Sequence, residues 1–153
     1  MKNYVCIMGL DPGLSGAVAF YYPSHPENIA CYDMPAVDKR VNGAALYDLI
    51  QQHRPDLAII EAVHSMPGQG VSSSFSFGVS YGIAQGVIAA AKVPVVFVTP
   101  GKWKKYFLLS SDKEASRGLA INKWPASDHF RKKKDEGRAE AALIALWGAK
   151  TQI

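Results

Sequence analysis

Short blocks of apolar residues, separated by turn-forming residues, make up the first third of the chain. Three blocks rich in Val, Ile and Tyr predict a meander of strands over residues 4–10, 17–22 and 29–34. Two continuous apolar runs, over residues 57–60 and 95–98, are typical of strands that are covered on both faces of a sheet. The pattern therefore predicts five strands.

From residue 43 onward, apolar residues also recur at helical spacing. They predict a helix over residues 43–53, which ends before Pro55, and a long helix over residues 72–92. Three further helices are predicted over residues 101–109, 113–124 and 134–150. Because three meandering strands precede two strands joined through helices, we expect an α/β fold with one mixed sheet and helices on both faces. In this sheet, three antiparallel strands are followed by two parallel ones, and a single domain covers residues 1–153.

The basic residues are concentrated in one part of the chain. The protein has 17 Lys and Arg and 13 Asp and Glu, but the segment 102–134 alone contains ten of the basic residues and three of the acidic ones. Such asymmetry is typical of proteins that bind a polyanion such as nucleic acid, although a solvated basic surface gives the same pattern. No apolar stretch approaches the roughly 18 residues of a membrane span, so no membrane association is expected.

The N-terminal residues and the two cysteines point to an ordinary intracellular domain. We interpret the first residues as the start of the first strand rather than as a signal peptide, because no small-residue cleavage site follows them. Cys6 and Cys31 both lie in apolar, strand-like runs, so they are expected to be buried free thiols.

Acidic residues follow two of the predicted central strands. Asp11 ends the first strand, before a Pro-Gly turn, and Glu61 ends the fourth. Ligands of open α/β sheets bind at the carboxyl ends of strands. In the last helix, Glu136 and Glu140 share one face and repel each other, which a divalent cation would offset. Each acid also has a structural explanation, in a turn, a loop or a first helical turn, but together they suggest a site for Mg²⁺ or Mn²⁺.

Five stretches of the sequence together resemble the RuvC-type Holliday junction resolvases (crossover junction endodeoxyribonucleases) of the ribonuclease H-like superfamily. They are GLDPGLSGAVAF, the Glu after LAII, SSFSFGVSYGIAQGV, VTPGKWKK and GRAEAALIALWG, and they span nearly the whole chain. The resemblance implies an RNase H-like fold, a homodimer and metal-dependent, two-metal cleavage of four-way DNA junctions that leaves 5′-phosphate and 3′-hydroxyl ends. It also implies a cytoplasmic location in a bacterial or phage-infected cell.

The resemblance implies four metal-ligating positions, which would hold two Mg²⁺ ions, or Mn²⁺ in their place. Asp11, Glu61 and Glu140 match three of these positions. The fourth ligand is expected about one helical turn before Glu140, but the residue three positions before it is Gly137, which has no side chain to ligate. Glu136 therefore becomes the candidate, with Asp135 as the alternative.

Several residues are predicted to contact DNA. The basic candidates for phosphate binding are Lys102, Lys104, Lys105, Arg131, Lys132, Lys133 and Lys134. The resemblance implies that the loop after Glu61 probes the junction centre, with His64 or Met66 as the probing side chain, although a mobile loop without any readout fits the sequence equally well. Trp103 is expected in the core rather than as a platform for base stacking.

Small residues recur every four positions in the long predicted helix, at Ser74, Gly78, Gly82 and Gly86. Glycine in a helix costs up to about 1 kcal/mol relative to alanine, so the close approach of another backbone would have to compensate. The resemblance implies that this helix forms the dimer interface, through Phe75, Gly78, Tyr81, Gly82 and Gly86. Packing of the stripe against the chain's own sheet is the alternative.

Three other functions are compatible with parts of this pattern. A nuclease with broader specificity for branched DNA, such as forks and flaps, would use the same acidic site. A non-catalytic junction-binding protein would not need the acids that are present. A sugar- or acetate-kinase-like ATPase shares the sheet and the first hairpin, but it requires a second domain with its own phosphate-binding loops.

Overall fold

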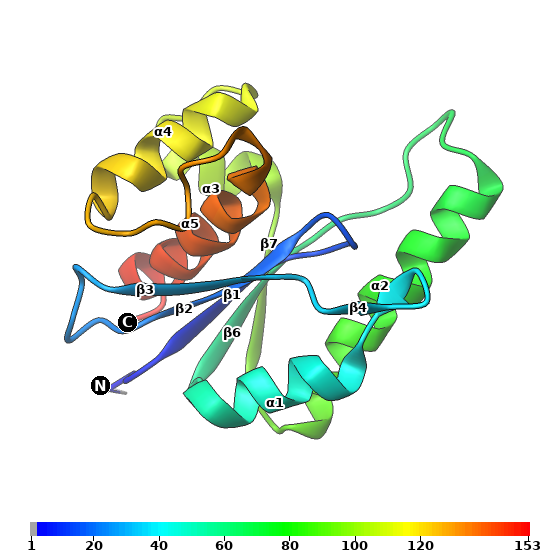
Figure 1. The fold of residues 1–153 in the computed structure, drawn as a ribbon, viewed down its shortest axis with the longest axis horizontal. Helices are drawn as coiled ribbons and strands as arrows, with labels where there is room; N and C mark the ends of the chain where they lie inside the picture. The colour runs from blue at the N-terminus through cyan, green and yellow to red at the C-terminus, as the bar shows by residue number, and fades with distance from the viewer. Residues whose placement is uncertain (1–2) are drawn as a thin grey trace.

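The computed structural model describes residues 3–153, and their centre is a five-stranded mixed sheet with the order β3-β2-β1-β6-β7 (Figure 1). Strands β1 and β2 pair antiparallel, as do β2 and β3, whereas β6 pairs parallel with β1, and β7 pairs parallel with β6. The strands span Ile7–Asp11 (β1), Ala17–Tyr21 (β2), Ile29–Asp33 (β3), Leu57–Glu61 (β6) and Val95–Val98 (β7). The predicted mixed sheet is therefore confirmed.

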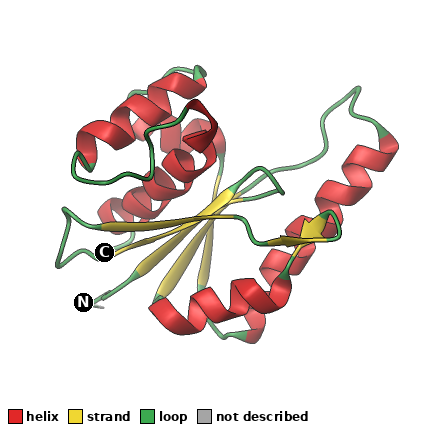
Figure 2. Ribbon diagram, in the orientation of Figure 1, coloured by secondary structure: helices red, strands yellow, loops and turns green. Residues whose placement is uncertain are grey.

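Helices cover both faces of this sheet, as predicted (Figures 1 and 2). On one face lie α1 (Gly43–His53) and α2 (Val71–Ala90), whose apolar side chains form one core cluster with the sheet. A second core cluster lies on the opposite face. The elements on that face are α3 (Pro100–Tyr106), α4 (Lys113–Lys123), the 3₁₀ helix η1 (Lys133–Asp135) and α5 (Glu136–Thr151).

Two local features differ from the prediction. The first is a two-stranded ribbon of β4 (Ala36–Val37) and β5 (Arg40–Val41), which was not predicted. Its turn residues Asp38 and Lys39 adopt positive φ angles of 49° and 61°. Glycine usually marks such turns in a sequence, and this turn contains none. Helix α3 ends at Tyr106 rather than at residue 109, since Leu108 takes the left-handed conformation, with φ of 57°.

Helix α5 lies directly against the backbone of β1. A β-carbon on Gly9 in β1 would overlap the main chain of Ala141 and Ala145 in α5. The absence of a side chain at this one position therefore lets the helix touch the central strand. This close approach brings the first two turns of α5 next to the end of β1, where Asp11 lies.

Helix α2 packs on the sheet mainly through its second half. Its buried residues are Ser80, Ala84 and Ile88, whereas Val71 and Phe75 in its first turns are 88% and 73% exposed. Figure 1 shows this first part extending beyond the edge of the sheet. Among the described residues, no helix, α2 included, combines the length and the apolarity that a membrane span requires.

Candidate metal centre

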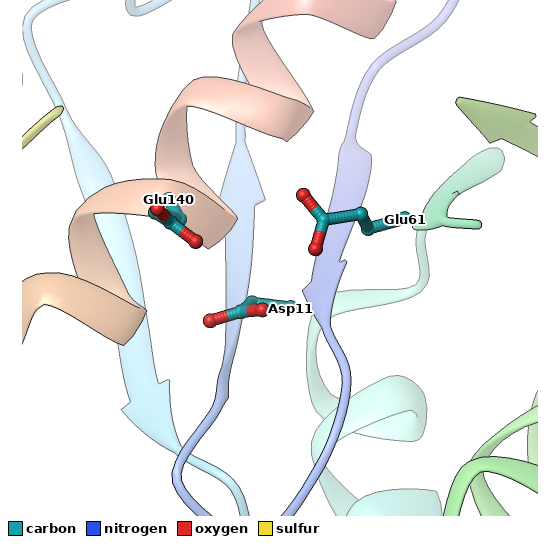
Figure 3. A group of neighbouring side chains, drawn as sticks. All are labelled: Asp11, Glu61 and Glu140. Atoms are coloured by element: carbon teal, nitrogen blue, oxygen red, sulfur yellow. The ribbon is translucent and has the colours of Figure 1, made fainter. Parts of the chain in front are cut away.

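Three carboxylates from separate elements converge at one end of the sheet. Asp11 is the last residue of β1, Glu61 is the last residue of β6, and Glu140 lies in the second turn of α5. Because β1 and β6 are parallel neighbours, with Leu10 opposite Ile60, their acids emerge side by side. One oxygen from each of the three side chains lies within 4.8 Å of the others, and Figure 3 shows them pointing toward one space.

Glu61 is the most enclosed of the three, with 7% of its surface exposed. Its Oε2 accepts a hydrogen bond of 2.7 Å from the indole Nε1 of Trp103. Burial raises the pKa of the Glu61 carboxyl above its ordinary value. The indole hydrogen bond opposes this rise in pKa, the nearby charge of Glu140 adds to it, and Lys104 opposes it.

One cation lies beside the three acids. The Nζ of Lys104 is 3.6 Å from Oε1 of Glu140, and it lies over the ring of Trp103, 5.5 Å from the ring centroid. The oxygens that converge here all belong to carboxylates. An all-carboxylate donor set of this kind fits hard divalent cations such as Mg²⁺ or Mn²⁺.

A cavity of about 290 Å³ opens beside Asp11 and Glu140. The turn between β1 and β2, over residues 12–16, forms one wall, and Phe77 of α2 and the start of α5 complete it. Glu136 lines this cavity, one helical turn before Glu140. Asp11, Glu136 and Glu140 therefore border this cavity, and Glu61 is not among its lining residues.

The two candidates for the fourth ligand differ in their surroundings. Asp135 does not line the cavity; its carboxylate accepts a 2.8 Å hydrogen bond from the backbone N–H of Lys132 and lies 3.9 Å from the guanidinium of Arg138. At Gly137, a β-carbon would come within 2.8 Å of the main-chain oxygen of Ser15. Glu136 therefore lines the same cavity as Asp11 and Glu140, which Asp135 does not, but among the described residues it is not part of the trio whose oxygens converge within 4.8 Å.

The predicted DNA-contacting residues are exposed, except Lys104, which is half-buried beside the acids. Lys102 and Lys105 line a separate hollow with Thr151 and Gln152 at the C-terminal end of α5. Lys104 points to Glu140, whereas Lys102 places its Nζ over the ring of Trp147, 5.8 Å from the centroid. Arg131 pairs with Asp128 at 2.6 Å and is exposed, like the residues 132–134 that follow it and lead into α5. His64 and Met66 lie exposed in the loop between β6 and α2.

The glycine stripe of α2, formed by Gly78, Gly82 and Gly86, faces away from the chain's own core. A β-carbon at any of these positions would meet no atom of the described residues within 4 Å. The alternative that the stripe packs against its own sheet is therefore wrong. Phe75 is exposed on this side, but Tyr81 turns inward, where its hydroxyl donates to the main-chain oxygen of Glu61 at 3.0 Å.

Two aromatic contacts of the site were not expected from the sequence. Trp103 was predicted as a core residue, and it is fully buried, but its indole also reaches Glu61. Phe77 stacks on Tyr81, with ring centroids 5.8 Å apart, and lines the cavity. The spacing of apolar residues indicates burial alone, so no signal in the sequence identified these partners.

The chain is similar in structure to known junction resolvases. A structure of Thermus thermophilus RuvC in complex with a Holliday junction substrate matches with a TM-score of 0.65 and 14% identity, over 97% of this chain and 96% of that one. Another T. thermophilus RuvC structure matches with a TM-score of 0.65 and 13% identity, over 96% of each chain. The yeast mitochondrial Holliday junction resolvase Ydc2 matches with a TM-score of 0.54 and 14% identity, over 95% of this chain and 81% of that one.

At the level of sequence, no protein-family model and no curated protein matches the chain. The structural matches nevertheless cover nearly the whole chain. The RNase H-like fold of the RuvC resolvases, which the sequence motifs implied, is therefore confirmed.

Proposed function

We propose that this protein is a divalent-metal-dependent endonuclease that cleaves four-way DNA junctions. The observation that carries the proposal is the convergence of Asp11, Glu61 and Glu140 within 4.8 Å, at the carboxyl ends of two parallel central strands. The proposal is supported by the shared fold, since one structural neighbour is a RuvC bound to a Holliday junction substrate.

Asp11, Glu61 and Glu140 would hold the metal, with Glu136 as the candidate for a fourth ligand. Mg²⁺ or Mn²⁺ held there, two ions in the arrangement that the resemblance implies, would supply activation of water and stabilisation of the leaving oxygen. The side chains prepare the site for this chemistry. Trp103 fixes Glu61, and Lys104 balances part of the negative charge beside Glu140.

The basic surface would hold the phosphates on either side of the scissile one. Residues 131–134 lead straight into the acidic helix, and Lys105 lies on α3 next to Lys104. Contacts of this kind provide most of the affinity for DNA and make it dependent on salt. The exposed loop with His64 and Met66 extends from the end of β6, so it would reach toward the centre of the junction.

The protein would act as a homodimer that joins through α2. The exposed face of this helix carries Val71, Phe75 and the glycine stripe, and the whole helix contains no charged residue over its 20 positions. An exposed, uncharged helix face with no intrachain partner at its glycines is typical of an interface between subunits. Two copies would present two active sites to the symmetric strands of a junction.

The test is cleavage of synthetic substrates, namely a four-way junction, a fork, a flap and a linear duplex, in Mg²⁺ or Mn²⁺. We expect the wild-type protein to cut the junction in preference to the others. The variant Asp11→Asn is expected to bind the junction but to lose cleavage. The control Asp48→Asn removes an exposed acid on α1 and is expected to cleave normally.

Each alternative outcome has a distinct meaning. Unchanged cleavage by Asp11→Asn would refute the metal site. Equal cutting of forks, flaps and junctions would favour the nuclease of broader specificity. Binding without cleavage by the wild-type protein, in either metal, would favour the non-catalytic junction-binding protein.

A further inference from the structure

Glu61 is restrained at its backbone and at its side chain by two different helices. Its main-chain oxygen accepts the hydroxyl of Tyr81 from α2 at 3.0 Å. Its Oε2 accepts the indole N–H of Trp103 from α3 at 2.7 Å. The chain beyond it is held to β7, since the N–H of Ala62 donates to the oxygen of Val98 at 2.8 Å. The two main-chain contacts fix the backbone at Glu61, and the indole hydrogen bond restricts the orientation of its carboxylate.

The indole that holds Glu61 is itself rigidly placed. Trp103 is fully buried in the core cluster beneath α5. It lies in the first turn of α3, where the side chain of Thr99 caps the helix and Pro100 sets its first position. The next residue, Lys104, contacts Glu140, so consecutive residues of one short helix touch two of the three acids.

We propose that Trp103 is a positioning residue that makes Glu61 a ligand through one oxygen and thereby favours Mg²⁺ and Mn²⁺ over Ca²⁺. This inference rests on the proposed metal centre. The indole engages Oε2, and one oxygen of Glu61 lies within 4.8 Å of oxygens of Asp11 and Glu140; in this proposal Oε1 has the role of metal ligand. Ca²⁺ takes six to eight oxygen ligands and readily binds a carboxylate through both oxygens, whereas Mg²⁺ requires a compact octahedron. A carboxylate with one oxygen engaged suits the smaller ion.

The inference is tested by the equilibrium binding of Mn²⁺ to the purified, metal-free full chain, followed through the electron paramagnetic resonance signal of free Mn²⁺. Competition with Ca²⁺ in the same titration gives the selectivity. Donors to metal-bound carboxylates typically contribute 10- to 100-fold to metal affinity. We therefore expect Trp103→Phe to weaken Mn²⁺ binding by about 10- to 100-fold and to reduce the preference for Mn²⁺ over Ca²⁺.

The chain offers a matched control in Trp124. This residue is also buried, at 1% exposure, and its indole also donates one hydrogen bond, to the main-chain oxygen of Pro26 at 3.1 Å, away from the acids. Trp124→Phe therefore removes the same atoms and a similar bond, and we expect it to leave Mn²⁺ binding unchanged. An equal loss in both variants would mean that general packing matters, and it would overturn the inference.

A second replacement separates the hydrogen bond from the volume of the ring. Incorporation of 3-benzothienylalanine at position 103 keeps the bicyclic shape and removes the N–H. We expect the same loss of Mn²⁺ affinity as in Trp103→Phe, and this replacement decides the matter if Trp103→Phe does not fold. Binding equal to that of the wild type, in this protein or in Trp103→Phe, would overturn the inference.

The result also distinguishes this inference from the proposed function. A wild-type chain that binds Mn²⁺ and shows the expected loss in the Trp103 variants, but that cuts no junction, would leave the role of Trp103 standing and refute the nuclease. A wild-type chain that binds no Mn²⁺ would overturn both.

Discussion

Replacing the glycines of the α2 stripe by alanine is expected to raise the stability of the isolated chain and to lower the affinity of the dimer. A β-carbon at Gly78, Gly82 or Gly86 would meet no atom of the described residues within 4 Å outside the adjacent backbone of α2, so alanine fits at each position of the monomer. Each replacement removes a helix cost of up to about 1 kcal/mol, or roughly 3 kcal/mol for Gly78→Ala, Gly82→Ala and Gly86→Ala together. In a protein of this size, about 1 kcal/mol shifts Tm by roughly 2–4 °C, so the triple variant is expected to melt roughly 6–12 °C higher as a monomer.

The same three methyl groups are expected to weaken the dimer. If two copies meet along this stripe, the missing side chains let the helix backbones approach closely. Extra methyl groups in a packed contact typically cost about 1–3 kcal/mol, and each 1.4 kcal/mol is tenfold in affinity. We therefore expect the dissociation constant of the dimer to rise about 5- to 140-fold, even though the monomer becomes more stable.

The two effects are separated by sedimentation equilibrium, which gives the dimer affinity, and by melting curves at concentrations that hold each variant monomeric. The matched control replaces Ser72, Ser73 and Ser76, which are exposed on the same helix but away from the stripe, by alanine. This control is expected to keep the dimer affinity of the wild type. An unchanged dissociation constant in the triple alanine variant would refute the proposed interface. A lower Tm of its monomer would show that the three positions are not open in the monomer, and it would refute the expected gain in stability.

Three further changes test other parts of the structure. Burial raises the pKa of the Glu61 carboxyl above its ordinary value of 4.5, so the folded chain binds the carboxyl proton more tightly than the unfolded chain does. The free energy of unfolding therefore falls as the pH rises from 4.5 through the raised pKa. Glu61→Gln in EDTA is therefore expected to melt higher than the wild type at pH 7, with the difference closing toward pH 4; a constant difference would contradict this. Gly137→Asp is expected to lower stability by about 1–3 kcal/mol in urea unfolding, because its β-carbon meets the main chain of Ser15. Leu108→Gly relieves a left-handed residue that is 92% exposed, and calorimetry is expected to show a Tm about 2–4 °C higher.

The sheet could be predicted from the sequence because its signals are local. The apolar runs and turn residues located all five of its strands, and Pro55 correctly marked the end of α1. The β4–β5 ribbon carries no such signal, since Asp38 and Lys39 form its turn without glycine. The direction in which the glycine stripe faces was also undetermined, because it depends on how α2 packs on the sheet rather than on the composition of the helix.

The residues of the candidate site could likewise be predicted where the sequence signal is local, but their contacts could not. Asp11 and Glu61 could be located because each ends a predicted central strand, and Glu140 because it interrupts an apolar helix face. The choice between Asp135 and Glu136 depends on a hydrogen bond to Lys132 that no spacing indicates. The contacts of Trp103 and Lys104 with the acids likewise depend on where α3 lies relative to β6 and α5, and the sequence alone does not define that position.

One packing contact accounts both for the convergence of Asp11 and Glu140 and for the lack of room at Gly137. Helix α5 lies so close to β1 that Gly9 has no room for a side chain, and this closeness brings Glu140 to Asp11. The same closeness presses the start of α5 on the turn before β2, so Gly137, where the resemblance implies a ligand, has no room for one either. A carboxylate can then enter this corner only from a neighbouring helical position, and Glu136 lies four residues before Glu140, on the same helix face. If Glu136 is the fourth ligand, as proposed, the tightness of the helix–sheet contact explains why the acid lies at this position rather than at residue 137.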